Sequence, residues 1–125
     1  MSYHIDINYA RRRSALTLTG AVDMAVLRAA IQAIWSAPSY DPAFDGVLDA
    51  TEAQLHLSLG DVYRLFRMVR ESPQHVTGRF AFVSPQPFGA AMAMLYERRS
   101  HLERRVSVFS TREAAEAWLD LPPGT

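Results

Sequence analysis

The stretch that decides the fold is Val47-Leu48-Asp49-Ala50-Thr51, followed by the helix signal Ser58-Leu59-Gly60-Asp61. Gly46 to Ala50 is a short apolar run, which is typical of a strand covered on both faces. Ser58 and Asp61 have the spacing of a helix capping box, with Asp in place of the usual Glu. A buried strand followed by a helix indicates an open α/β sheet, in which sites gather at the carboxyl ends of the strands.

Two half-buried strands are predicted at the start of the chain. Apolar and polar residues alternate from Tyr3 to Tyr9 and again from Ala15 to Thr19, and Gly20 ends the second strand. The short link at 10–13 between them predicts an antiparallel hairpin. This link contains three arginines, Arg11 to Arg13, which predict a solvated turn or, alternatively, an anion-binding patch.

Strands and helices alternate along the rest of the chain. Further strands are predicted at 79–84 and 106–109, and 51–57 is read as irregular. The segment Ser110-Thr111-Arg112-Glu113 has the pattern of a capping box. Apolar stripes at helical spacing predict four helices, which contain Met24 to Trp35, Val62 to Val69, Phe88 to Tyr96 and Ala114 to Leu119.

The order of these elements is β-β-α-β-α-β-α-β-α. It indicates an α/β domain with a single five-stranded, mostly parallel sheet, right-handed crossovers and an antiparallel N-terminal hairpin. We expect one domain over residues 1–125, since this length suits a single domain. We also expect the strands to follow chain order in the sheet and the helices to lie largely on one face.

Composition narrows the classes of function. The formal net charge is zero, so nothing favours nucleic acid as a partner, and cysteine is absent, which excludes disulfides and thiolate chemistry. No apolar stretch approaches the roughly 20 residues of a transmembrane helix, and the N-terminus lacks a signal-peptide pattern. We therefore expect a cytoplasmic protein. The four histidines lie in separate segments, so we expect neither a metal nor a cofactor.

Several segments together carry a resemblance to a known family. They are Leu18-Thr19-Gly20, Asp41-Pro42-Ala43-Phe44, Val47-Leu48-Asp49 and the ending from Val108 to Leu119. With them, nearly the whole chain resembles the STAS superfamily, the fold of the SpoIIAA-like anti-sigma-factor antagonists. Within it, the chain looks most like small bacterial proteins grouped with STAS and CRAL-TRIO lipid-transfer domains. The resemblance implies the fold and adds little about activity.

The antagonists also carry a phosphorylation segment, Asp-Ser-Ser-Gly, after their third strand. The matching stretch here is Leu57-Ser58-Leu59-Gly60, in which leucines replace the aspartate and the modified serine. Only Ser58 and Gly60 match the family pattern. Ser58 is therefore a candidate for phosphorylation, and a plain helix N-cap is the alternative.

Polar residues near the predicted strand ends are candidate groups for binding a ligand or a partner. Asp49 is either a site carboxylate or a local cap for the loop after its strand. Thr51 is a second candidate phosphoacceptor, since added charge is favourable near a helix N-terminus. Ser84 stands between a strand and a helix, where either an anion site or a packed turn is expected. Ser110 completes this polar rim.

The helices predicted around Phe66 and Phe88 contain more apolar bulk than one stripe requires. Phe88 and Met92 are the main candidates there for contact with a ligand or a partner. A core with methionine as filler, a dimer face and a groove for an apolar ligand all explain this bulk.

Three hypotheses of function follow. The first is a non-enzymatic binding or regulatory module, a homodimer that docks a protein partner. The alternative is a binder of a small apolar ligand or lipid, of the CRAL-TRIO-like type. An enzyme with a site at Asp49, Ser58 and Ser84 ranks last, because no acid–base pair at chemical spacing and no nucleotide or nucleophile motif is found.

Overall fold

The computed structural model describes residues 3–73, 77–84 and 106–122. These residues form β1 (Tyr3–Asn8), β2 (Arg13–Val22), α1 (Met24–Trp35), β3 (Asp45–Leu55), α2 (Leu59–Glu71), β4 (Phe80–Val83), β5 (Val106–Phe109) and α4 (Arg112–Leu119). The helix predicted around Phe88 to Tyr96 lies outside the described residues. The element order otherwise matches the prediction.

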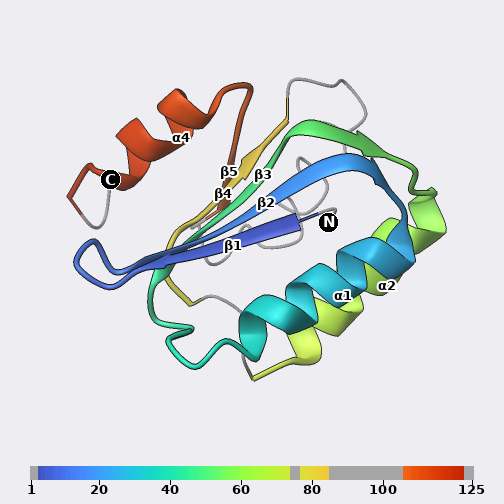
Figure 1. Ribbon diagram of the computed structural model, residues 1–125, viewed down its shortest axis with the longest axis horizontal. Coiled ribbons are helices and arrows are strands. Elements are labelled where there is room, and N and C mark those ends of the chain that lie inside the picture. Colours follow the sequence, from blue (N-terminus) through green and yellow to red (C-terminus); the bar gives the residue numbers. More distant parts are fainter. Residues whose placement is uncertain (1–2, 74–76, 85–105, 123–125) are drawn as a thin grey trace.

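The five strands form one mixed sheet in the order β1-β2-β3-β4-β5. β1 pairs antiparallel with β2, and the three following pairs are parallel (Figure 1). The predicted hairpin, the mostly parallel sheet and the chain-order arrangement of its strands are therefore confirmed.

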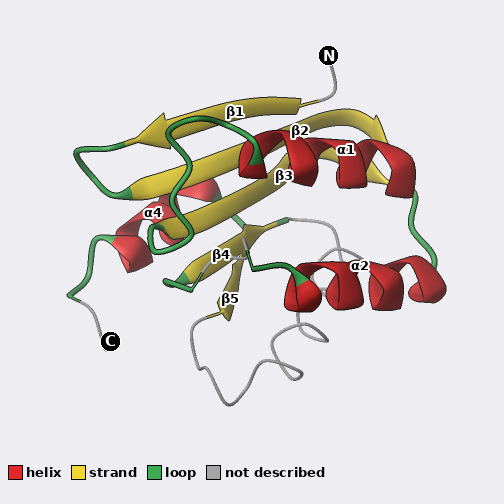
Figure 2. Cartoon of the chain, turned by 90° about the horizontal axis from the view of Figure 1, so that it is seen from below, coloured by secondary structure: helices red, strands yellow, loops and turns green. Residues whose placement is uncertain are grey.

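The helices lie on both faces of the sheet, which differs from the prediction. α1 and α2 cover one face, whereas α4 lies on the other (Figures 1 and 2). Right-handed crossovers between successive neighbouring strands place their helices on one face. α4 follows the last strand and connects no pair of strands, so this rule does not determine its face.

The two faces have separate apolar cores. On the α1 face, Leu16, Leu18 and Leu48 pack with Leu27 and other buried residues. The core on the α4 face is smaller, with small side chains in the strands. It contains Ala15, Val47, Ala81, Val83, Ala115 and Leu119.

β2 and β3 are both longer than predicted. β2 does not end at Gly20, which has a φ of +70° and lies inside the strand, and β3 continues through most of the segment read as irregular. The β2–β3 register shifts between Thr17 and Thr19, so β3 has one extra residue there, a β-bulge. β4 pairs with β3 only as far as Asp49. The part of β3 after Asp49 is therefore more exposed, and its sequence no longer shows a continuous apolar run.

Two local predictions at the ends of elements are corrected, and one is confirmed. Arg13 is the first residue of β2 and is buried, so it does not belong to a solvated turn. The N-cap of α4 is Thr111, whose hydroxyl accepts the Ala114 N–H, and not the first residue of the predicted capping box, Ser110. The capping box of α2 is formed as predicted, because Ser58 and Asp61 exchange hydrogen bonds of 3.0 and 3.1 Å.

Candidate functional site

Asp49 is held inside β3 at the bulge. Its Oδ1 accepts the Thr51 N–H at 2.9 Å and the Thr51 hydroxyl at 2.7 Å, while its Oδ2 accepts from Arg112 Nη1 at 3.0 Å. The bulge takes Thr51 out of register with β2. The Asp49 carboxylate accepts the Thr51 N–H, which has no partner in the β2–β3 pairing. Asp49 therefore stabilises the bulge and links β3 to α4.

The charge of Asp49 is stabilised although the side chain is buried. Burial raises the pKa of Asp49. The hydrogen bonds from Thr51 and Arg112, together with the charge of Arg112, lower it by more than burial raises it, so the pKa lies below its ordinary value. Burial likewise lowers the pKa of Arg112, and the contacts with Asp49 and Glu116 raise it above its ordinary value. An ionised carboxylate with a lowered pKa is a weak base.

A chain of ion pairs continues from Arg112, through Glu116, to Arg13 at the start of β2. Glu116 accepts from Arg112 Nε at 3.0 Å through one oxygen and from Arg13 Nη1 through the other. Arg13 Nη2 in turn donates to Asp120 at 3.0 Å. The side chain of Arg13 is only 7% exposed, so its charge depends on these two acids.

Arg79 fixes the other end of α4. It donates to the carbonyl oxygens of Trp118, Leu119 and Leu121 at 2.8 to 3.1 Å and pairs with Asp45 at 3.1 Å. The last carbonyls of a helix have no partner within the helix, and a cation there is favourable. α4 is thus held by guanidinium groups near both of its ends.

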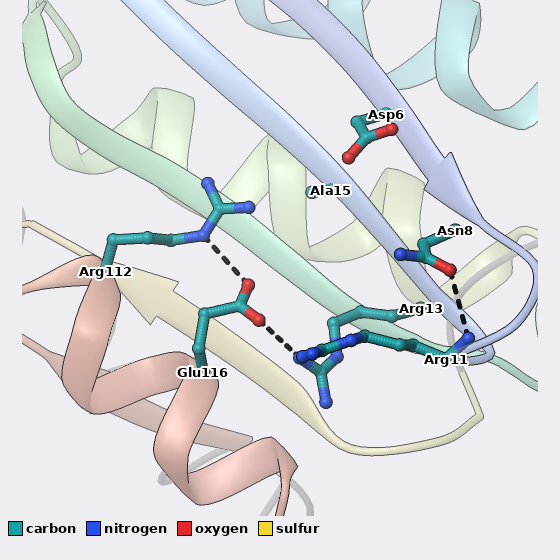
Figure 3. Close-up of a pocket in the computed structure, with 7 residues that line it drawn as sticks. All are labelled: Asp6, Asn8, Arg11, Arg13, Ala15, Arg112 and Glu116. Carbon is teal, nitrogen blue, oxygen red and sulfur yellow. Dashed lines mark hydrogen bonds and ion pairs between the residues drawn. The ribbon is translucent and has the colours of Figure 1, made fainter.

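A pocket of about 490 Å³ lies between α4 and the N-terminal hairpin (Figure 3). We call it the polar groove. Its lining comes from β1, the hairpin turn, β2 and α4, and consists of Asp6, Asn8, Arg11, Arg13, Ala15, Arg112 and Glu116. The groove is therefore lined almost entirely by charged and amide side chains.

Some polar groups in the groove have no partner among the described residues. Arg13 Nε is buried without a hydrogen bond, and Arg112 uses Nε and Nη1 but not Nη2. Arg11 is exposed, and its guanidinium lies 3.6 Å from Asp120. Because Arg13 Nε is inaccessible to solvent, the donors that the groove offers to an incoming polar group are Arg112 Nη2 and the exposed guanidinium of Arg11.

The structure brings only some of the predicted site residues together. Asp49 and Thr51 are hydrogen-bonded to each other. Ser58 caps α2, which lies on the opposite face of the sheet from α4 (Figure 1), and its N–H lowers the pKa of Asp61. Ser84 is buried, and its N–H donates to the carbonyl oxygen of Phe109 at 2.9 Å, next to the last β4–β5 pair; the residues that follow it, on which the choice between an anion site and a packed turn depends, lie outside the described residues. Ser110 is exposed before α4.

Two further candidates, Phe88 and Met92, lie outside the described residues. The predictions made for them therefore stay predictions.

Of the residues that line the groove, the sequence indicates only Arg11 and Arg13, through the alternative of an anion-binding patch at 11–13, and it does not mark Arg112 or Glu116 as site residues. Arg112 and Glu116 are four apart, a spacing that places both on one side of a helix. Arg13 continues the alternation of Ala15 and Thr17 backwards by one step, which places it on the same face of the sheet. Both signals are present in the sequence, but neither indicates that the two segments meet.

Comparisons with known proteins identify the fold. No protein-family model matches the chain, and no curated protein matches it. Among solved structures, it is similar to an uncharacterized protein of the DUF3478 family with a SpoIIAA-like fold from Shewanella loihica PV-4. The TM-score is 0.61 at 15% sequence identity, over 94% of this chain and 91% of that one. The chain has a SpoIIAA-like fold.

A second solved structure is the anti-sigma factor antagonist SpoIIAA in its unphosphorylated form. It is 16% identical, with a TM-score of 0.48 over 96% of this chain and 98% of that one. The resemblance to the SpoIIAA-like fold drawn from the sequence is thus confirmed at the level of the fold. Within the described part of this fold, no helix is long and apolar enough to cross a membrane.

Proposed function

We propose that the protein is a non-enzymatic binding or regulatory module that docks a protein partner at the polar groove. The observation that supports this most directly is the incomplete cover of one sheet face. α4 packs on β3, β4 and β5, while the outward residues of β1, which are His4, Asp6 and Asn8, are exposed. A polar, open surface beside a fixed helix suits a partner that brings hydrogen-bonding and charged groups.

The bonding of the candidate catalytic residues favours a non-enzymatic module. Asp49 accepts three hydrogen bonds and is a weak base, Ser58 caps a helix, and Ser84 is buried. A general base needs a free position within reach of a substrate proton. These groups instead stabilise the fold.

The lining of the groove also bears on the alternative function, the binding of an apolar ligand. Sites for such ligands are mostly apolar, with few polar groups. The polar groove has the opposite character. The alternative would therefore need a different site. It rests on the apolar bulk of the helices that contain Phe66, Phe88 and Met92, and of these Phe88 and Met92 lie outside the described residues.

The proposal is tested by site-specific photo-crosslinking in the host. One variant carries a photoreactive residue in place of Asn8, which lines the groove. A control variant carries it in place of Gln32, which is exposed on α1. We expect a defined crosslinked partner from Asn8 that is absent from Gln32. Identical crosslinks from both positions, or none from Asn8, would contradict a docking site at the groove.

The captured partner is then purified and its affinity measured. Arg11→Glu reverses a charge in the groove, and Arg28→Glu makes the same change on the exposed side of α1. We expect Arg11→Glu to weaken binding about tenfold or more and Arg28→Glu to leave it unchanged. Equal effects of the two variants would show that net charge, and not the groove, governs binding.

A further inference from the structure

β1 is the edge strand of the sheet, and within the described residues only β2 pairs with it. Natural edge strands are usually protected from further pairing by charged side chains, especially lysine, by proline or by a bulge. β1 contains no lysine or proline, its one carboxylate is Asp6, and its register with β2 runs unbroken from Tyr3↔Leu18 to Asn8↔Arg13. The outer edge of β1 is therefore a regular template for another strand.

The apolar side of β1 is incompletely covered. Tyr3, Ile5 and Ile7 face α1 but are only half-buried, although Tyr3 and Ile5 pack against the main core. A strand added beside β1 would cover the remaining surface of this row with a second row of apolar side chains. The sheet edge thus offers both backbone and apolar contacts to the same partner.

We infer that the partner at this edge is a second copy of the chain, paired antiparallel through β1 about a two-fold axis at Ile5. In this register Ile5 lies opposite Ile5 of the second copy, and Tyr3 lies opposite Ile7. On the other side of the strand, each His4 lies opposite Asp6 of the other copy. An imidazole N–H can donate to a carboxylate, so the two-fold axis creates two such pairs.

Charge and length select this register over its neighbours. Antiparallel pairing must keep the two apolar rows on the same face, so the axis passes through a residue. An axis at Asp6 places two carboxylates directly opposite each other, which is destabilising. An axis at His4 pairs only residues 3–5 within the strand and an axis at Ile7 only residues 6–8, whereas the axis at Ile5 pairs residues 3–7.

The symmetry has a consequence for the rest of the molecule. A two-fold axis perpendicular to the sheet keeps equivalent faces together, so both α4 helices and both polar grooves would lie on one face of a ten-stranded sheet. The inference does not depend on the proposed function, because the groove is complete within one chain. A monomeric protein could still dock a partner there.

The test is the dissociation constant of self-association, measured by sedimentation equilibrium. We expect a concentration-dependent dimer for the unmodified chain. His4→Asp turns both pairs into carboxylate–carboxylate contacts and should raise the dissociation constant about tenfold or more. The exchange of both residues, His4→Asp with Asp6→His, restores the two pairs and should restore the dimer.

The matched control is His56→Asp, which makes the same change at an exposed position beyond β3 and should leave the dimer intact. Asp6→His alone removes the carboxylate acceptor and should also weaken the dimer, although less than His4→Asp because imidazoles that are mostly neutral at pH 7 repel each other less than carboxylates do. Either single variant therefore serves if the other fails to fold. A monomer at all concentrations, or a dimer insensitive to both single variants, would overturn the inference. Weakening without recovery in the double variant would overturn the register.

Discussion

The two faces of the sheet are stabilised in different ways. On the α1 face, large aliphatic side chains of β2, β3 and α1 are buried together. The α4 face has few large apolar residues, and guanidinium–carboxylate contacts join its helix to the strands. The comparison suggests a division of roles, with one face giving most of the folding free energy and the other presenting a polar surface whose geometry is fixed by charge.

The largest expected effect comes from the apolar face. Leu18 is 1% exposed, and Leu18→Ala removes part of the main core and leaves a cavity. We expect the free energy of unfolding to fall by about 3 kcal/mol, as measured by urea denaturation. A loss below about 1 kcal/mol would show that this face contributes less than the comparison requires.

The next effect comes from the charged face. Asp49→Asn keeps the shape of the side chain but sets an amide against Arg112, and we expect a loss of about 2 kcal/mol in the free energy of unfolding. Glu52→Gln makes the same kind of change at an exposed residue of the same strand and should cost nothing measurable. Equal losses of unfolding free energy in the two variants would show that the contact between Asp49 and Arg112 adds nothing to stability.

The same variant gives a pH prediction. The pKa of Asp49 is lower in the folded chain than the value of about 3.9 in an unfolded one. Its charge therefore adds stability above that value, and this stability is lost as the pH falls through the folded pKa. The difference in unfolding free energy between the unmodified chain and Asp49→Asn should shrink below about pH 4. A difference that is constant with pH would contradict this assignment.

The smallest effect concerns the start of α4. Thr111→Ala removes the N-cap and should cost about 1 kcal/mol, whereas Ser110→Ala should cost almost nothing. Thermal unfolding of the two variants makes the comparison. A larger loss of stability for Ser110→Ala than for Thr111→Ala would show that Ser110 is the N-cap, as the predicted capping box requires.

Much of the fold follows from the sequence because its signals are local. The alternation in β1 and the apolar stripe of α1 each predict their element from neighbouring residues alone. The longer β3 is missed because its second half loses β4 as a neighbour, and polar residues such as Glu52 and Gln54 then interrupt the apolar run. The face of α4 is missed because no crossover rule applies to a helix after the last strand.

The candidate site follows less well from the sequence because its contacts join distant segments. The strand pattern selects Asp49, but its partner Arg112 is 63 residues away. Arg13 and Glu116 are 103 residues apart, so nothing near either residue indicates the pair. The arginines at 11–13 look alike in sequence, and only the start of β2 separates the buried one from its exposed neighbours.

Native-state hydrogen exchange of Asp49→Asn tests the central comparison most directly. If charges hold α4 to the sheet independently of the main core, the amides of α4 should exchange about tenfold faster in the variant than in the unmodified chain. Those of α1 should keep their protection. Equal acceleration in α1 and α4 would show one cooperative core, and it would contradict the division of the molecule into an apolar face and a charged one.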